Sequence, residues 1–202
     1  MYREMKRRLA IEMYDKGMIK FGEFKLSSGL TSPFYIDLRL IPSYPELVEL
    51  ATKLLIKTVE HVDYEYIVGI ATGGIALASF MAYELKKPMG YVRLERKGHG
   101  LLKSVEGIVN NRNVLIVDDV ATTGSTLVTA AKTLENSGAK IASALVIVDR
   151  EQGAEESLKK IGVKLYWVFK VTELFRILLT ENLIGRDTYE RVIKYIKNFS
   201  YC

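Results

Sequence analysis

The sequence contains a single cysteine, Cys202, so no disulfide can form within the chain. Chains of reducing compartments commonly lack disulfides, and we expect a cytoplasmic location. The first fifteen residues, "MYREMKRRLAIEMYD", carry charges throughout and lack the apolar core of a secretory signal. A length of 202 residues allows one substantial core and requires no second one. We therefore expect one domain over residues 1–202.

The sequence also lacks a convincing membrane span. Residues 66–83, "YIVGIATGGIALASFMAY", are uncharged over 18 positions, the lower limit of spanning length. The break at Thr72-Gly73-Gly74 divides this run into a β-branched part and a helix-like part. A buried strand, a turn and a core helix are therefore expected, without a membrane partner. The pattern Gly-x-x-x-x-Gly-Lys is absent too, which excludes a Walker loop.

Neither sign of charge dominates the composition. Lys and Arg number 29 and Asp and Glu 24, a formal charge of +5. This mild excess favours anionic partners and does not require nucleic acid. The densest basic cluster, Lys6-Arg7-Arg8, lies in an amphipathic helical segment and predicts a solvated face. We expect small-molecule partners and no nucleic acid.

The middle of the chain alternates short apolar runs with helical patterns. This order implies right-handed crossovers and a doubly wound α/β core, with a mostly parallel sheet and helices on both faces. The predicted strands are residues 66–70, 88–94, 113–120 and 140–149, and the predicted helices are 45–62, about 74–85 and about 125–136.

The two flanks differ from this core. Residues 20–41 are rich in aromatics, Gly, Ser and Pro, and predict short irregular strands around a turn at Ser28-Gly29. With the N-terminal segment they are expected to form a small cap, or hood, over residues 1–41. The C-terminal third predicts one more strand followed by two helices.

The segment "VLIVDDVATTGST", residues 114–126, carries the clearest chemical signal. In open α/β sheets ligands bind beyond the carboxyl ends of the strands, where Asp118 and Asp119 are expected. The loop from Thr122 to Thr126 then opens a helix, so its N–H groups and hydroxyls suit a phosphate. Gly124 permits positive φ and close approach of an anion.

The two adjacent carboxylates are costly unless a cation or a set of hydroxyl donors meets them. A sugar phosphate with vicinal hydroxyls satisfies both the acids and the loop. In a simpler interpretation, Asp119 turns the chain and Thr123 or Ser125 caps a helix. The hydroxyl- and glycine-rich loop attached to the acids favours the ligand site.

This segment closely resembles the phosphoribosyl-pyrophosphate (PRPP) motif of type I phosphoribosyltransferases. Three further stretches resemble the orotate phosphoribosyltransferase family in particular. They are "FKLSSGLTSPFYIDLR" (24–39), its N-terminal signature; "RLERKGHG" (93–100), its catalytic loop; and "VDREQG" (148–153), the strand end whose arginine binds orotate. The resemblance covers residues from about 24 to 153, in the family's order.

The resemblance implies a reaction. Orotate and PRPP, with Mg²⁺, would give orotidine 5′-monophosphate and pyrophosphate, a step of pyrimidine (UMP) biosynthesis. It also implies a homodimer in which the loop around Arg93–His99 reaches the neighbouring subunit's site. The hood would cover the base.

The resemblance further implies a role for each matching residue. Asp118 and Asp119 would hold the ribose hydroxyls, partly through waters of the metal, with no direct side-chain ligation of Mg²⁺. The loop from Thr122 to Thr126 would hold the 5′-phosphate, and small residues of a second loop would let backbone amides reach the pyrophosphate. The implied PRPP-binding residues are Ala71, Thr72, Gly73, Gly74, Asp118, Asp119, Val120, Ala121, Thr122, Thr123, Gly124, Ser125 and Thr126.

The leaving pyrophosphate gains negative charge, so cations should accelerate its departure. Arg93, Lys97 and His99 would close over it, and with Asp119 they are the implied catalytic residues. Arg150 would pair with the orotate carboxylate as a planar fork. The implied orotate-binding residues are Ser27, Phe34, Tyr35, Thr122 and Arg150.

The chain departs from the family at three positions. Many members have lysine where this chain has Ser27, Gly73 and Leu94, and each change removes a cation near the reaction. Arg96 and Lys103 lie close to Leu94 in the sequence.

Two alternatives stay open. One is a phosphoribosyltransferase for another base, such as a purine, against which the signature at 24–39 argues. The other is a PRPP-sensing regulator without catalysis. The N-terminal helix, expected to span about 19 residues, is too short for a helix-turn-helix module and argues against a regulator.

Overall fold

The computed structural model describes residues 1–25, 31–94 and 104–198. Its main feature is a six-stranded sheet in the order β5-β4-β3-β6-β7-β8. The strands are β3 (Tyr66–Ile70), β4 (Met89–Val92), β5 (Val105–Glu106), β6 (Asn113–Ala121), β7 (Lys140–Asp149) and β8 (Leu165–Lys170). Every neighbouring pair is parallel except β4 and β5. The mostly parallel, doubly wound sheet is therefore confirmed.

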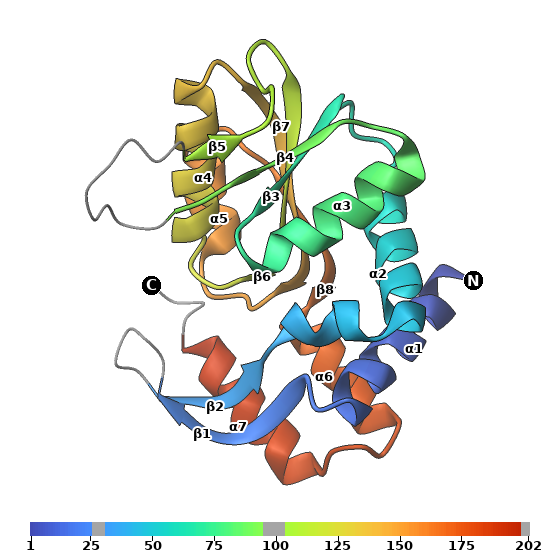
Figure 1. Cartoon of the computed structure of the whole chain (residues 1–202). Coiled ribbons are helices and arrows are strands. Elements are labelled where there is room, and N and C mark those ends of the chain that lie inside the picture. Colours follow the sequence, from blue (N-terminus) through green and yellow to red (C-terminus); the bar gives the residue numbers. More distant parts are fainter. Residues whose placement is uncertain (26–30, 95–103, 199–202) are drawn as a thin grey trace.

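Helices cover both faces of this sheet (Figure 1). α2 (Pro45–Thr58) and α3 (Gly73–Leu85) lie on one face, and α4 (Ser125–Asn136) and α5 (Ala154–Lys159) on the other. Alternate residues of β6 divide between the two layers, because side chains of a strand point to opposite faces. Leu115 and Val117 belong to the core under α2 and α3, and Val114 and Ile116 to the core under α4.

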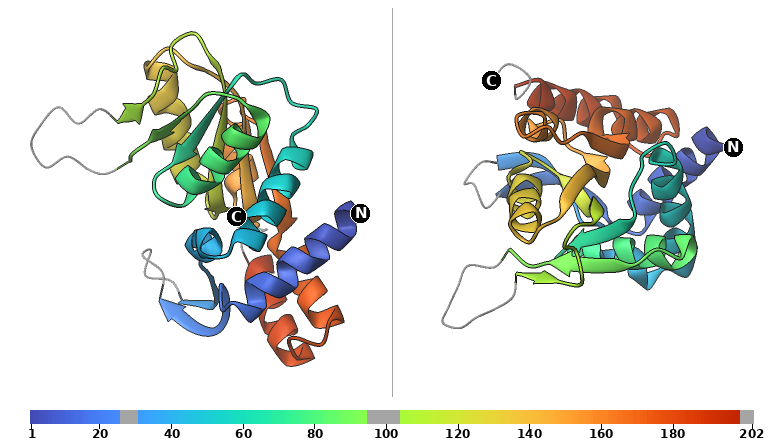
Figure 2. Two further views of the ribbon diagram at one scale, coloured as in Figure 1. Left: turned by 45° about the vertical axis from the view of Figure 1, so that its right-hand side comes forward. Right: turned by 90° about the horizontal axis from the view of Figure 1, so that it is seen from above.

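A second lobe lies beside one end of the sheet (Figures 1 and 2). It contains an antiparallel hairpin of β1 (Ile19–Lys25) and β2 (Thr31–Ile36), followed by the 3₁₀ helix η1 (Leu38–Ser43). Helices α1 (Tyr2–Asp15), α6 (Val171–Thr180) and α7 (Arg186–Lys197) complete the lobe. The Phe21 and Phe34 rings lie 5.2 and 5.0 Å from the Phe175 ring, measured between centroids. The C-terminal helices thus pack directly on the N-terminal hairpin.

Several predicted boundaries change. β6 ends at Ala121, one residue beyond the predicted strand 113–120, and Asp118 and Asp119 lie within its last residues instead of beyond its end. α2 ends at Thr58, four residues before the predicted end. The short elements β5, α5 and η1 had no sequence prediction, since none is long enough to establish a period. Within the described ranges, none of the helices combines the length and the apolar character that crossing a bilayer requires.

The basic cluster near the N-terminus is more than a solvated face. Lys6 Nζ lies 2.7 Å from Glu173 Oε1, and only 12% of the Lys6 side chain is exposed. Arg7 Nη2 lies 2.5 Å from Glu181 Oε2. These pairs join α1 to α6 and the residues that follow it, so the expectation of full solvation was wrong for Lys6.

Replacing Gly74 by alanine should destabilise the fold. A Cβ at Gly74 would lie 2.2 Å from the Val117 carbonyl oxygen, which is backbone of a central strand and cannot easily move. We expect Gly74→Ala to lower the free energy of unfolding by about 2 kcal/mol or more, measured by urea denaturation.

Gly185→Ala is the control, because a Cβ there meets no atom within 4 Å and φ is −77°. Its cost should stay below about 1 kcal/mol. Equal costs for the two variants would contradict the close approach of α3 to β6.

Candidate functional site

The candidate site lies where the chain order of the sheet reverses. β3 leads through α3 to β4 on one side, and β6 leads through α4 to β7 on the other. Pairing of β3 with β6 ends at Gly69 and Val117, beyond which β6 continues along β7 to Ala121. The carboxyl ends of β3 and β6 therefore separate, which leaves a crevice of the kind that binds ligands in open α/β sheets.

Two acids stand at this crevice. Asp118 is buried and Asp119 partly buried. The Asp119 N–H donates to Asp118 Oδ1 at 2.9 Å, and the Val120 N–H donates to Asp119 Oδ1 at 2.8 Å. These hydrogen bonds lie beyond the last β3 pair, where β6 has lost its neighbour on that side. Each carboxylate thus accepts a hydrogen bond from a neighbouring backbone N–H group and has further acceptor positions that a ligand can use.

Burial is the main cause that raises the pKa of Asp118 well above its usual value, and the neighbouring Asp119 charge adds to it. Burial also raises the pKa of Asp119, while Arg39 acts in the opposite direction. Two adjacent carboxylates with raised pKa values are costly in the folded chain. Groups perturbed in this way are typical of functional sites.

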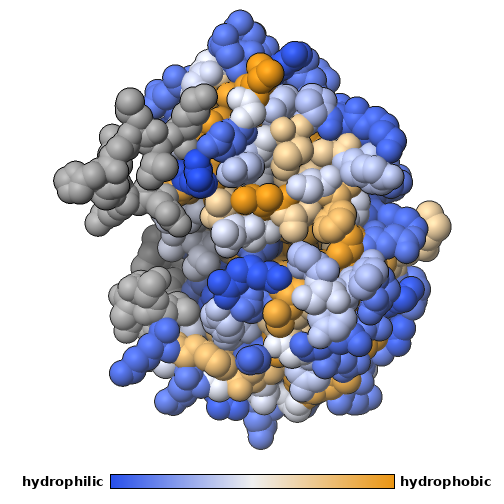
Figure 3. Space-filling view, viewed as in Figure 1, coloured by the Kyte–Doolittle hydropathy of each residue, from blue (hydrophilic) through white to orange (hydrophobic). Residues whose placement is uncertain are grey.

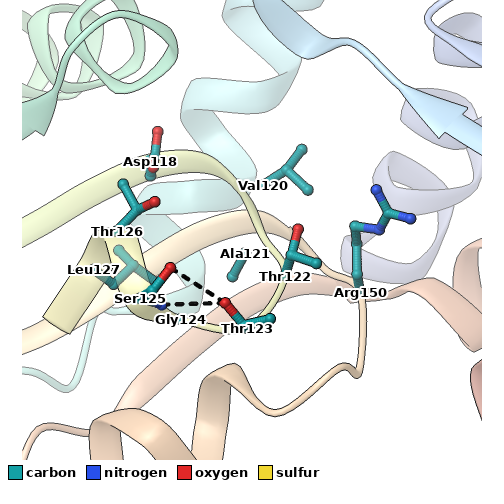
Figure 4. Close-up of a pocket in the computed structure, with 10 residues that line it drawn as sticks. All are labelled: Asp118, Val120, Ala121, Thr122, Thr123, Gly124, Ser125, Thr126, Leu127 and Arg150. Carbon is teal, nitrogen blue, oxygen red and sulfur yellow. Dashed lines mark hydrogen bonds between the residues drawn. The ribbon is translucent and has the colours of Figure 1, made fainter. Parts of the chain in front are cut away.

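A cavity of about 440 Å³ lies against Asp118, and Asp119 is not among its lining residues (Figure 4). Its lining consists of Asp118, residues 120–127 and Arg150. Gly124, at the N-cap of α4, has φ of 81°, and a Cβ there would lie 2.9 Å from Ala154 Cα. Conformation and space therefore both favour glycine. The loop presents hydroxyls and the first N–H groups of α4 to the cavity, an arrangement that suits an anion.

The segment from Ala71 to Gly74 lies on the other side of the crevice and contains a cis peptide between Ala71 and Thr72. A Cβ at Gly73 would lie 2.6 Å from Asp119 Oδ2. The Asp119 carboxylate thus fills the space that a side chain at position 73 would need. The lysine that the sequence resemblance leads one to expect at this position does not fit beside this Asp119 rotamer. Since α3 begins at Gly73, the N-termini of α3 and α4 both lie close to the acid pair.

Arg150 follows β7 and closes one edge of the cavity (Figure 4). It is 6% exposed, and burial lowers the pKa of its guanidinium. Nη2 donates to Ser32 Oγ at 3.1 Å, and the guanidinium carbon lies 4.4 Å from the centroid of the Phe34 ring. Within the described part of the chain, Nε has no hydrogen-bond partner. A buried cation with a spare donor at a cavity suits a ligand carboxylate.

The structure does not bring every predicted residue into this cavity. Phe34 is fully buried, with Arg150 over its ring, while Tyr35 points to the opposite face of β2. Tyr35 Oη accepts a hydrogen bond from Arg39 Nη2 at 3.2 Å. Arg93 does not line the cavity, and its Nη2 lies 2.6 Å from Glu106 Oε1. Ser27, Arg96, Lys97, His99 and Lys103 lie outside the described residues.

Three residues near the site were given no role from the sequence. Ser32 binds Arg150, and Arg39 pairs with Asp37 and acts electrostatically on Asp119. Asp149 is 2% exposed, and burial raises its pKa to about 6. All three lie within the stretches 24–39 and 148–153, so their presence was visible. Their contacts were not, because these contacts join segments far apart in the sequence.

The doubly wound fold, with the loops 71–74 and 122–126 at one crevice, is typical of a particular class of proteins. Comparison with known proteins confirms that class. The family model for the phosphoribosyl transferase domain matches residues 42–174, more than half of the chain. The class is therefore that of the phosphoribosyltransferases.

Individual relatives narrow the class. The orotate phosphoribosyltransferase of Sulfolobus acidocaldarius is 40% identical over 187 residues, which cover 92% of this chain and 95% of that protein. The crystal structure of orotate phosphoribosyltransferase from Aeropyrum pernix has a TM-score of 0.79 and 39% identity, and the match covers 88% of this chain and 99% of that one. Leishmania donovani UMP synthase gives a TM-score of 0.88 at 30% identity, covering 96% of this chain and 42% of that one. The chain belongs to the orotate phosphoribosyltransferase family.

The buried Asp149 predicts a dependence of stability on pH. Because its folded pKa of about 6 exceeds the usual value of 3.8, the native state keeps this proton where the unfolded state releases it. Its contribution is thus zero below pH 3.8 and destabilising by roughly 2 to 3 kcal/mol above pH 6. We expect Asp149→Asn, whose amide oxygen can still accept from the Glu151 N–H, to raise the free energy of unfolding at pH 7.5 by up to roughly 2 kcal/mol.

Denaturation at pH 7.5 and pH 4 checks this prediction, and the gain should shrink at the lower pH. Asp63→Asn, at an exposed acid, is the control and should change little at either pH. A gain of equal size at both pH values would rule out titration of Asp149 as its cause.

Proposed function

We propose that this chain transfers the phosphoribosyl group of PRPP to orotate, giving orotidine 5′-monophosphate and pyrophosphate, in de novo UMP biosynthesis. The observation that carries the proposal is one crevice in which a buried acid pair lies close to two helix N-termini and a buried arginine closes the adjoining cavity. Relatives about 40% identical over nine tenths of the chain are named orotate phosphoribosyltransferases.

The crevice suggests how PRPP is oriented. Its 5′-phosphate binds the loop from Thr122 to Thr126 at the N-terminus of α4, where N–H groups are free of helical partners. Its ribose hydroxyls donate to Asp118 and Asp119, which offsets the cost of burying these acids. Its pyrophosphate lies against the segment from Ala71 to Gly74, at the N-terminus of α3. Each charged part of the substrate thus meets a complementary group.

The acid pair also fits Mg²⁺, which prefers oxygen ligands and retains several waters. Within the described ranges there is no cluster of three or more His, Cys, Asp or Glu side chains that could enclose a metal. Asp118 and Asp119 would therefore hold Mg²⁺ through water, together with oxygens of PRPP. When bound, the ion supplies positive charge to the departing pyrophosphate.

The chain's own residues stabilise two charges that develop as the bond between the sugar and pyrophosphate breaks. The sugar becomes positive in an oxocarbenium-like transition state, and the carboxylates at its hydroxyls stabilise that charge. The leaving group becomes more negative, which calls for the cations that the sequence resemblance assigns to Arg93, Lys97 and His99. Arg150 orients the base by its carboxylate, so that the attacking nitrogen faces the sugar.

We further propose a homodimer. The supporting observation is an apolar surface formed by α3 and the adjacent η1, where Leu40, Phe80 and Tyr83 are 41%, 36% and 73% exposed. Apolar side chains also gather over α3 on the face shown in Figure 3. Contiguous exposed apolar surface commonly marks a protein contact. The cytoplasmic location stays a prediction from the single cysteine.

A substrate panel tests the proposed reaction. With PRPP and Mg²⁺, the purified protein should convert orotate and not adenine, guanine or xanthine, with nucleotide formation followed by chromatography. Arg150→Ala should raise the KM for orotate at least tenfold and leave the KM for PRPP within about twofold, because only orotate loses its charged partner.

Conversion of a purine without orotate would overturn the choice of base. Binding of PRPP and of a specific DNA site without any turnover would instead indicate a regulator. An unaltered KM for orotate in Arg150→Ala would refute the role of that arginine.

Subunit mixing tests the shared loop. Lys97→Ala and Asp119→Asn homodimers should each be nearly inactive. If Lys97 acts in the neighbouring subunit, a mixed dimer contains one complete site, and an equal mixture of variants refolded together should regain about a quarter of wild-type activity. No regain despite mixed dimers, which mass spectrometry of differently tagged chains detects, would show that Lys97 acts in its own subunit or not at all.

A further inference from the structure

Three segments that are remote in the sequence meet around the Arg150 side chain. Ser32 and Phe34 come from β2, Gln152 follows Arg150 itself, and Tyr195 comes from the C-terminal helix α7. Ser32 and Phe34 are 0% exposed and Gln152 is 7% exposed. The arginine at the edge of the cavity thus contacts buried groups of β2, and α7 lies next to them.

The Ser32 hydroxyl can act only as a hydrogen-bond acceptor toward Arg150. Its proton is donated to the Phe34 carbonyl oxygen at 2.8 Å. The Ser32 oxygen is therefore left as an acceptor, and Arg150 Nη2 donates to it at 3.1 Å. One corner of the guanidinium is fixed in this way, while the buried Nε has no hydrogen-bond partner within the described residues.

The guanidinium carbon of Arg150 lies over the Phe34 ring, 4.4 Å from its centroid. This ring contacts Phe175 at 5.0 Å and 78° and Tyr195 at 6.0 Å and 88°, both edge to face. Tyr195 Oη also accepts a hydrogen bond from Gln152 Nε2 at 3.4 Å. Helices α6 and α7 therefore both pack against the ring over which Arg150 lies.

We propose that Ser32 and Tyr195 are positioning residues, which hold the Arg150 guanidinium in the orientation that binds the carboxylate of orotate. The C-terminal helix α7 is in consequence part of the base site. The inference rests on the proposed function, since it takes orotate as the ligand of Arg150. A planar fork must be held in one orientation to bind a carboxylate through two hydrogen bonds.

Binding of two nucleotides separates positioning from general structural support. Orotidine 5′-monophosphate carries the carboxylate, and uridine 5′-monophosphate differs from it only by lacking that group. By calorimetry, we expect Ser32→Ala to weaken binding of orotidine 5′-monophosphate about tenfold and Tyr195→Phe about threefold. Binding of uridine 5′-monophosphate should change less than about twofold in either variant.

Matched controls are available for both substitutions. Ser143→Ala removes a serine that is also buried, at 1% exposed, and whose hydroxyl has no partner within the described residues. Tyr166→Phe removes a phenol that contacts His61 instead of the base site. Both should bind the two nucleotides as the wild type does. In turnover, the KM for orotate should rise in Ser32→Ala and Tyr195→Phe while the KM for PRPP holds.

Equal weakening of both nucleotides, or unchanged affinity for orotidine 5′-monophosphate, would overturn the positioning role. If Ser32→Ala fails to fold, Tyr195→Phe decides by the same comparison. If the wild-type protein binds orotidine 5′-monophosphate no more tightly than uridine 5′-monophosphate, the proposal that orotate is the base is refuted. That result concerns the wild type and is therefore distinct from the two outcomes in the variants.

Discussion

The architecture of the site depends on the burial of two adjacent carboxylates at the end of a central strand. Asp118 and Asp119 are held there because β6 continues along β7 after β3 has turned away. Burial raises the pKa of both acids, so the folded chain carries an electrostatic cost that a bound polyol and cation would relieve. The two acids thus lower the stability of the fold and at the same time provide the groups that would recognise the ligand. Such a conflict between stability and function is common at functional sites.

The surroundings of the acid pair follow from close packing of backbone on backbone. Gly73 and Gly74 let α3 begin directly against β6, since a Cβ at either position would overlap the Asp119 carboxylate or the Val117 carbonyl. Gly124 gives α4 its left-handed N-cap beside the same acids. Two helix N-termini are thereby directed at one crevice, which suits a substrate that is anionic at both ends. β2 adds Ser32 and Phe34 as partners of Arg150, and α7 packs on the Phe34 ring.

Local patterns in the sequence predicted most of the central sheet. The boundaries of β3, α4 and β7 agree to the residue, because strong apolar periodicity and flanking glycines define them. Contacts between distant segments could not be predicted in this way. Packing of Phe34 on Phe175 joins the hood to the C-terminal helices, and it depends on the tertiary fold alone. The fit of Asp119 over Gly73 has the same origin, since it joins residues 46 positions apart in the sequence.

A crystal structure of the protein with PRPP and Mg²⁺ tests the central claim most directly. The account predicts that the 5′-phosphate lies on the backbone N–H groups between Thr122 and Thr126, and that the ribose hydroxyls contact Asp118 and Asp119. PRPP bound away from the crevice between β3 and β6, or turned so that its pyrophosphate occupies the Thr122–Thr126 loop, would contradict it.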